Sequence, residues 1–272
     1  MIVNPHAKIN IGLSITEKRS DGFHNIETVF YPVALCDTLN IELSADNASP
    51  KLNFVCEGIK LSGAAPNDNL CCKAYHLLDA DFNLPPVNIR LHKAIPVGAG
   101  LGGGSSDAAY SLMALNELCN LQISNDKLEK YANKLGSDCA FFLQKEASFG
   151  TGKGNILKPL SLSLEQYHII IVKPPVFVST ADAYSSVIPR KRTSFLPELL
   201  KAPISDWHKT IFNDFEETVF KKFPETERIK ERLYDEGAIY ASLSGSGASV
   251  YGIFKDNPEY IAKLFPECFV YQ

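Results

Sequence analysis

The chain has 272 residues, of which 45% are hydrophobic and 21% charged, and its formal net charge is −4 at pH 7. It is long enough for two modest domains with ordinary apolar cores. The mildly negative charge argues against a nucleic-acid partner, and no apolar run reaches the ~18 residues that a membrane span needs. Since the N-terminal residues also lack a leader pattern, we expect a cytoplasmic protein with no membrane partner.

The cysteines are odd in number and show no C-x-x-C spacing. We expect them to be reduced core thiols, and neither metal ligands nor a disulfide framework. They are Cys36, Cys56, Cys71, Cys72, Cys119, Cys139 and Cys268.

Residues 7–15 alternate strictly between apolar and polar side chains, which predicts a half-buried strand. Its polar face begins with Lys8 and Asn10. On the sequence alone, Lys8 is either a solvated surface charge or a cation that faces a ligand.

A turn signal, Asp21-Gly22, places Phe23 beside His24 before the next strand begins at Ile26. One interpretation puts Phe23 in the core and His24 at the surface with its hydrogen bonds satisfied. The other is an aromatic ring that stacks on a heterocycle next to an imidazole that hydrogen-bonds it.

The middle of the chain alternates further strands with helices. Asn69, within the capping residues 67–69, is expected to begin a helix, and Ser124 and Gly136 to bound another. Strands are expected at 39–43, 51–56 and 87–91.

The segment Pro96 to Asp107 has five glycines in the seven positions from Gly98 to Gly104. Packing does not explain such a run, which marks unusual backbone angles or close approach to a ligand. Helical spacing follows, so we expect a helix to begin near Ser105 or Ser106. A glycine loop at a helix N-terminus offers unpaired N–H groups and a positive dipole end, which together favour a phosphate.

Two familiar nucleotide-binding sequence patterns do not fit this loop fully. Gly98, Gly100 and Gly103 satisfy the dinucleotide pattern G-x-G-x-x-G, but Pro96 interrupts the approach and no acidic residue clearly closes a following strand. The Walker pattern fails because no Lys-Ser or Lys-Thr follows the glycines. A flexible turn with serine caps and no ligand is the remaining alternative.

The second half contains a possible site residue and several further elements. Asp138 precedes an apolar run, where it is either a helix N-cap or a carboxylate set in a pocket. Residues 149–155 suggest a hairpin, 167–172 a buried strand, and Ser179 or Thr180 a helix cap. Residues 241–254 predict a strand, a Gly/Ser turn and a second strand, and this turn permits close backbone approach.

Three motifs, in this order, resemble those of the GHMP small-molecule kinases. They are the strand motif from Pro5 to Asn10, the loop from Pro96 to Ser106, and the turn from Leu243 to Ala248. Residues 19–26 are further similar to the members that phosphorylate a cytidine diphosphate-linked methylerythritol for isoprenoid precursors. The resemblance runs from Pro5 to about Phe254.

This resemblance implies a two-domain α+β fold with the active site in the inter-domain cleft. Residues 1–150 would form the N-terminal ATP-binding domain, and 151–272 the C-terminal domain. The expected reaction moves the γ-phosphoryl group of ATP to the tertiary 2-hydroxyl of cytidine diphosphate methylerythritol, a small-molecule substrate. Mg²⁺ is the expected cofactor beside ATP, with Ser106 and Asp107 as candidate ligands. We expect a monomer or a weak homodimer.

The family's functional residues fall on matching positions of this chain. The catalytic pair corresponds to Lys8 and Asp138. ATP-binding positions correspond to Asn69, Lys93, Pro96, Val97, Gly98, Ala99, Gly100, Leu101, Gly102, Gly103, Gly104, Ser105 and Ser106. Substrate-binding positions correspond to Asn10, Phe23, His24, Thr180 and Tyr184. Many members have tyrosine where this chain has Phe23, so the stacking ring is kept and a phenol hydroxyl is lost.

Three alternatives remain open at this point. One is a kinase of the same fold that acts on homoserine, mevalonate or a sugar, against which the Phe23-His24 turn and Tyr184 argue. Another is a nucleotide-binding protein without catalysis, which the presence of both Lys8 and Asp138 disfavours. The last is a nicotinamide oxidoreductase.

Overall fold

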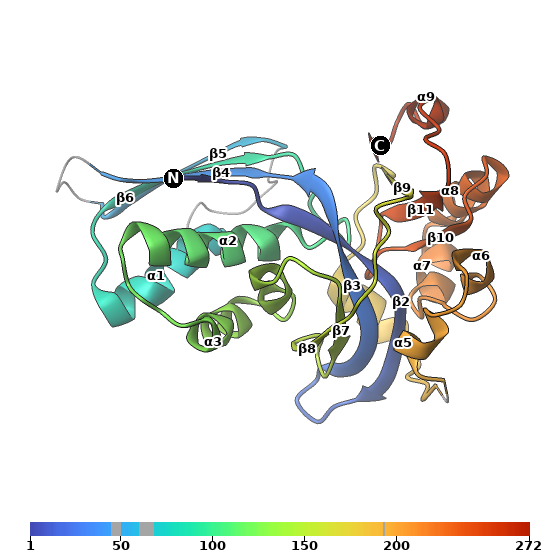
Figure 1. The fold of residues 1–272 in the computed structure, drawn as a ribbon, viewed down its shortest axis with the longest axis horizontal. Coiled ribbons are helices and arrows are strands. Elements are labelled where there is room, and N and C mark those ends of the chain that lie inside the picture. Colours follow the sequence, from blue (N-terminus) through green and yellow to red (C-terminus); the bar gives the residue numbers. More distant parts are fainter. Residues whose placement is uncertain (45–49, 60–67, 193) are drawn as a thin grey trace. The chain divides into compact units, whose positions relative to one another are not determined.

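A computed structural model describes residues 1–44, 50–59, 68–192 and 194–272 of the chain. They form two units, drawn together in Figure 1. The first unit comprises residues 1–7, 34–97 and 102–145, and the second comprises residues 8–33, 98–101 and 146–272. Each unit is therefore assembled from segments that lie far apart in the sequence.

The first unit contains a four-stranded sheet in the order β1-β4-β6-β5. The β4–β6 pair is antiparallel and the β5–β6 pair is parallel. The strands expected at 39–43, 51–56 and 87–91 are confirmed. The strand bounds are β1 (Ile2–Val3), β4 (Thr38–Leu43), β5 (Leu52–Gly58) and β6 (Val87–Lys93).

Three helices lie along one face of this sheet (Figure 1). They are α1 (Leu70–Phe82), α2 (Gly103–Leu118) and α3 (Asn125–Leu135). Alternate residues of β4 and β6 pack against them in one apolar core, which includes Leu39, Ile41, Val87, Ile89, Leu91, Ala74, Leu78, Leu112 and Leu115. Burying this surface is the main favourable contribution to the unit's stability.

The helix starts follow their capping residues. Asn69 is the N-cap of α1, and its side chain accepts a hydrogen bond from the Cys71 backbone N–H at 2.8 Å. Residue 67 lies outside the described residues. Helix α2 begins at Gly103, two positions before the expected start at 105. The earlier start arises because Gly102 adopts a left-handed φ of 73° and its carbonyl accepts from the Ser106 N–H at 2.9 Å.

The second unit contains two four-stranded sheets, ordered β2-β3-β7-β8 and β10-β11-β9-β12. The β7–β8 and β10–β11 pairs are antiparallel, so the expected hairpin and the strand-turn-strand segment are confirmed. The bounds are β2 (His6–Lys18), β3 (His24–Cys36), β7 (Ser148–Thr151), β8 (Ile156–Pro159), β9 (His168–Lys173), β10 (Tyr240–Leu243), β11 (Val250–Phe254) and β12 (Phe269–Tyr271).

Short helices complete the second unit, of which α8 packs along the sheet that holds β10 and β11 (Figure 1). The side chain of Ser179 caps α4, as one of the two expected caps. Their bounds are α4 (Thr180–Ser186), α5 (Leu196–Leu199), α6 (Ile204–Trp207), α7 (Glu216–Lys222), α8 (Pro224–Asp235) and α9 (Ile261–Leu264).

The expectation of a half-buried strand at residues 7–15 is wrong. Strand β2 is buried on both faces, and Lys8 and Asn10 are only 3% and 1% exposed. The polar face is covered because Leu101 and Tyr251, from other segments of the second unit, lie against the backbone of Lys8 and Asn10. A solvated surface charge is thereby excluded for Lys8.

All seven cysteines are free thiols. Three of them are fully buried, and the expectation of a core position is wrong for the other four, which are partly exposed. Among the described residues, none of the helices combines the length and the apolarity that a bilayer span requires. The same residues include no cluster of three or more His, Cys, Asp or Glu side chains that could hold a metal ion.

Candidate active site

The glycine loop uses its glycines for backbone conformation. Gly98, Gly100 and Gly102 have φ values of 62°, 72° and 73°, so every second residue is left-handed. Side chains with a Cβ rarely adopt that region, and three such positions in five residues require glycine.

In the second unit, the loop segment 98–101 lies against the turn 244–249, which joins β10 to β11. Ser244 Oγ donates to the Gly100 carbonyl oxygen at 2.9 Å, and the Ser249 N–H donates to the Ala99 carbonyl oxygen at 3.2 Å. A Cβ at Gly100 would come within 1.9 Å of the Ser244 carbonyl oxygen. The two backbones therefore touch without space for a side chain.

In the first unit, the start of α2 carries buried polar atoms that have no hydrogen-bond partner among the described residues. Ser106 Oγ and Asp107 Oδ1 are buried and make no hydrogen bond among the described residues. The first N–H groups of α2 also lack helical partners, and the helix dipole is positive at this end. Buried polar atoms are normally paired, so these point to a ligand with oxygen atoms or a metal ion.

Next to the first turn of α2, the first unit contains a buried group of three charges. Lys93 Nζ binds Asp37 and also donates to Asp107 Oδ2 at 2.7 Å. Asp37 Oδ1 accepts the backbone N–H groups of Ala94 and Ile95 at 2.6 and 2.8 Å. These contacts join the end of β3, the end of β6 and the start of α2. The ammonium group of Lys93, matched to an ATP-binding position, is thus committed to two carboxylates.

The ionisation of this group follows from its burial. Burial raises the pKa of Asp107 to about 7, although the Lys93 charge opposes the increase. For Lys93, burial lowers the pKa, but the Asp107 and Asp37 charges outweigh it and raise the pKa above its usual value. Lys93 therefore stays cationic between two carboxyl groups.

Lys8 lies at the start of β2 in the second unit. Its Nζ donates to Asn10 Oδ1 at 2.5 Å and lies 5.4 Å from the centre of the Phe30 ring, while its N–H donates to the Leu101 carbonyl oxygen at 3.0 Å. Asn10 Nδ2 donates to Thr28 Oγ1 at 3.0 Å. The lysine is thus bound directly to a residue of the glycine loop, and Asn10 orients its amine.

Asp138 lies in the first unit, immediately before the 3₁₀ helix η2 (Cys139–Leu143). It stands at the N-cap position of this helix, as one of the two interpretations expected, but its side chain makes no capping hydrogen bond there. The next residue, Cys139, interacts through its thiol with the Ser105 side chain. Asp138 itself is half-buried, and through Cys139 it adjoins the first turn of α2.

The exposures of Phe23 and His24 are the opposite of the interpretation that places Phe23 in the core and His24 at the surface. Phe23 is 53% exposed and lies over Lys153 Nζ at 4.4 Å, whereas His24 is only 9% exposed. The His24 ring stacks on Tyr184, with centroids 5.1 Å apart and an interplanar angle of 22°. Burial lowers the pKa of His24, and Lys18 adds to the effect, which favours a neutral imidazole.

Two matched positions have clear partners. Thr180 Oγ1 lies 3.3 Å from Ser246 Oγ, which brings α4 to the turn 244–249. Asn69 caps α1, and the next residue, Leu70, lies 3.8 Å from the position of a Cβ on Gly104. The N-terminal ends of α1 and α2 are thus neighbours in the first unit.

Three polar residues near these positions were not found from the sequence. Thr28 links Asn10 to the Gly12 carbonyl oxygen at 2.6 Å, Asp37 organises Lys93, and Asn213 binds the turn 244–249. Each was a single polar residue in an ordinary context, so only its contacts in the folded chain reveal its role.

Comparison with known proteins gives a consistent result. Residues 69–146 match the family described as GHMP kinases N terminal domain, and residues 195–264 match GHMP kinases C terminal. The chain is 50% identical to the 4-diphosphocytidyl-2-C-methyl-D-erythritol kinase of Bacteroides fragilis, over 100% of this chain and 98% of the relative. It is 53% identical to that of Bacteroides thetaiotaomicron, over 94% and 92%.

The solved structures agree on the fold. A 4-(cytidine 5'-diphospho)-2C-methyl-D-erythritol kinase superposes with a TM-score of 0.81 at 30% identity, covering 100% of this chain and 97% of the other. A homoserine kinase from Cytophaga hutchinsonii gives 0.68 at 15% identity, covering 98% and 94%, and this match supports the fold alone.

Replacing Gly100 by Ala is expected to lower the free energy of unfolding by roughly 1–3 kcal/mol. The new Cβ would meet the Ser244 carbonyl oxygen and sit at a positive φ. Gly104→Ala is the matched control, because its Cβ would meet only Leu70 at an ordinary distance, and helix interiors favour alanine. Urea denaturation measures both; equal stability of the two variants would contradict the close contact.

Replacing Lys93 by Met is expected to cost roughly 3–5 kcal/mol of unfolding free energy, since it leaves two buried carboxylates without their cation. Lys73→Met, at an exposed position of α1, should change stability little. Urea denaturation of both variants provides the comparison. If Lys93→Met kept full stability, the buried charges would not hold β6 and α2 together.

Proposed function

Because this chain belongs to the 4-diphosphocytidyl-2-C-methyl-D-erythritol kinase family of GHMP kinases, we propose that it transfers the γ-phosphoryl group of ATP to the 2-hydroxyl of 4-diphosphocytidyl-2-C-methyl-D-erythritol, a step toward isoprenoid precursors. The observation that carries the proposal is the glycine loop at the start of α2, with the unpaired, buried Ser106 hydroxyl in its first turn. Loop N–H groups and the helix dipole stabilise the charge on the phosphates.

Two residues carry the chemistry of the acceptor hydroxyl. Asp138 accepts its proton as the oxygen attacks phosphorus, which removes the barrier set by a poor nucleophile. Lys8 orients the attacking oxygen and offsets the negative charge that develops there. Support comes separately from the two units: Lys8 is buried and bound to Leu101, and Asp138 adjoins the first turn of α2.

The oxygen atoms at the start of α2 fit Mg²⁺, which prefers oxygen ligands and keeps several from phosphate and water. Ser106 Oγ would hold it, with Asp107 Oδ1 as a second protein oxygen. The ion would neutralise charge on the transferred phosphoryl group.

The cytidine end is assigned to the His24–Tyr184 pair. A neutral imidazole offers one donor and one acceptor to the edge of a pyrimidine, and the adjoining phenol ring offers a stacking surface. Phe23 supplies a second, exposed ring. Asn10 and Thr180 would contact the polyol and its phosphates.

The domain division at residue 150, the cytoplasmic location and the monomeric or weakly dimeric state stay predictions. The direct test is ADP release by the purified protein with ATP, Mg²⁺ and 4-diphosphocytidyl-2-C-methyl-D-erythritol. Mevalonate and homoserine serve as competing acceptors. Faster turnover of either competitor would overturn the substrate assignment.

Replacing Asp138 by Asn is expected to reduce turnover roughly a hundredfold or more, since the amide cannot accept the proton. ATP binding, measured as the rise in unfolding temperature that ATP causes, should stay close to that of the unmodified protein. Turnover near the original value would remove Asp138 from the general-base role.

Replacing His24 by Ala is expected to raise KM for the cytidine substrate about three- to tenfold, the usual value of one or two lost hydrogen bonds, and to weaken discrimination against the uridine analogue. His168→Ala, at an exposed position of β9, is the control. The measurement is steady-state kinetics with the cytidine substrate and with its uridine analogue. Unchanged discrimination between the two in the His24→Ala variant would place base recognition elsewhere.

A further inference from the structure

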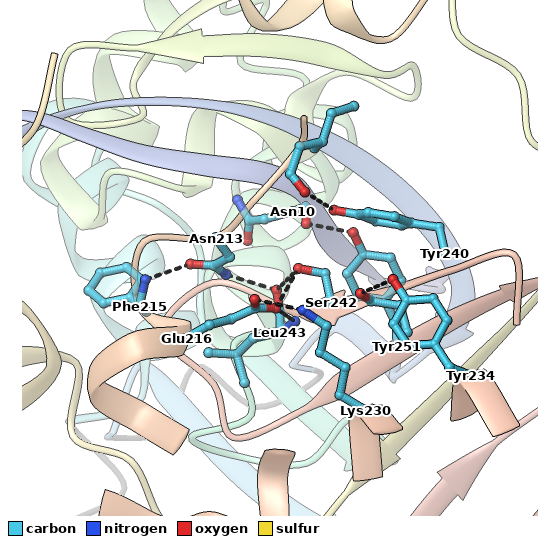
Figure 2. A network of polar contacts seen from close by, with 12 residues as sticks. Asn10, Asn213, Phe215, Glu216, Lys230, Tyr234, Tyr240, Ser242, Leu243 and Tyr251 are labelled. Carbon is cyan, nitrogen blue, oxygen red and sulfur yellow. Dashed lines mark hydrogen bonds and ion pairs between the residues drawn. The ribbon is translucent and has the colours of Figure 1, made fainter. Parts of the chain in front are cut away.

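The segment 212–216 lies between β2 and the turn 244–249, and its centre is a buried amide. Asn213 Nδ2 donates to the Leu243 carbonyl oxygen at 2.8 Å (Figure 2). It also donates to the Gly245 carbonyl oxygen at 2.8 Å. Its Oδ1 accepts the Phe215 N–H at 3.0 Å. Asn213 is 3% exposed, so both N–H groups and the carbonyl oxygen of the amide bind backbone in the interior.

Glu216, in the first turn of α7, holds the same end of β10. Its Oε1 accepts the Leu243 N–H and the Ser242 hydroxyl, each at 3.0 Å (Figure 2). Its Oε2 pairs with Lys230 Nζ of α8 at 2.7 Å. Hydrogen bonds to an ionised carboxylate are stronger than those between neutral groups. Asn213 and Glu216 thus bind Leu243, the residue at which the turn begins, through both its carbonyl oxygen and its N–H.

The same segment is also paired with β2. The Leu13 N–H donates to the Phe212 carbonyl oxygen at 2.9 Å, and the Asp214 N–H donates to the Leu13 carbonyl oxygen at 2.8 Å. The Ile15 N–H donates to Asp214 Oδ2 at 2.7 Å. Segment 212–216 therefore fixes the turn relative to the strand that carries Lys8 and Asn10.

The turn 244–249, which segment 212–216 holds in place, in turn contacts the glycine loop. Gly100 and Ala99 are bound by the turn, as described above, and Gly245 lies beside Asn10, where a Cβ would be 3.2 Å from Asn10 Oδ1. All of these segments belong to the second unit. A continuous series of polar contacts thus leads from Asn213 to residues 98–101, although Asn213 itself lies outside the loop.

We propose that Asn213 and Glu216 are positioning residues that hold turn 244–249 in the conformation that shapes loop segment 98–101 for the phosphates of the nucleotide. The inference rests on the proposed function for the identity of the ligand. Neither residue touches the reacting atoms; both act through the turn.

Asn213→Asp is the sharpest variant, because it keeps the size of the side chain, removes two donors and places a carboxylate oxygen against two carbonyl oxygens. The dissociation constant for ADP, measured by titration calorimetry, and KM for ATP are expected to rise about tenfold or more. KM values do not depend on the amount of folded enzyme. Unchanged constants, with only a lower active fraction, would show a purely structural role and overturn the proposal.

Tyr234→Phe is the matched control. The Tyr234 hydroxyl donates to the Ala241 carbonyl oxygen at 3.2 Å, so this hydrogen bond holds the same strand β10 but not the turn. It should lower the unfolding temperature while leaving both nucleotide constants unchanged. An equal rise in the constants of this variant would also overturn the proposal, because any loosening of β10 would then suffice.

Glu216→Gln keeps the test decisive if Asn213→Asp does not fold. It retains an oxygen acceptor for Leu243, loses the charge, and is expected to raise the ADP dissociation constant about threefold. An unchanged constant would overturn the role of Glu216. Turnover of the unmodified protein is measured first. If it shows no turnover but its ADP binding weakens in the variants, the proposed reaction is rejected and the positioning role is supported. If the unmodified protein does not bind ADP at all, both are rejected.

Discussion

The contact between Gly100 and Ser244 is the constraint on which the shape of the glycine loop in the second unit depends. The backbones touch where a Cβ would be 1.9 Å from a carbonyl oxygen, so the approach exists only because residue 100 is glycine. Two motifs far apart in the sequence thereby become one surface. The left-handed glycines and the Gly/Ser turn are both needed for this close backbone contact.

Buried and half-buried polar groups hold the elements of each unit together. Lys93 lies between Asp37 and Asp107 in the first unit, and Glu216 binds Lys230 and β10 in the second. Such groups stabilise a fold only when every partner is present, because an unpaired buried charge is costly. They therefore specify one arrangement of strands and helices. A purely apolar core would specify that arrangement less strictly.

Local patterns could be predicted from the sequence because they depend on neighbouring residues. The Asn69 cap, the hairpin at 149–155 and the strands expected at 39–43, 51–56, 87–91 and 167–172 follow from side chains a few positions apart. The same holds for the glycine loop that precedes α2. The motif order further allowed the kinase family to be identified before any contact was known.

Burial and long-range partners were decided by the tertiary structure. Lys8 was expected on a half-buried strand and is enclosed, and Phe23 and His24 exchange the exposure that simple patterning suggests. Asn213 contacts a residue 30 positions away. The sequence by itself determined the backbone conformations, caps and motifs, since these are local; only the folded chain decided which polar side chains are buried, because their partners come from distant segments.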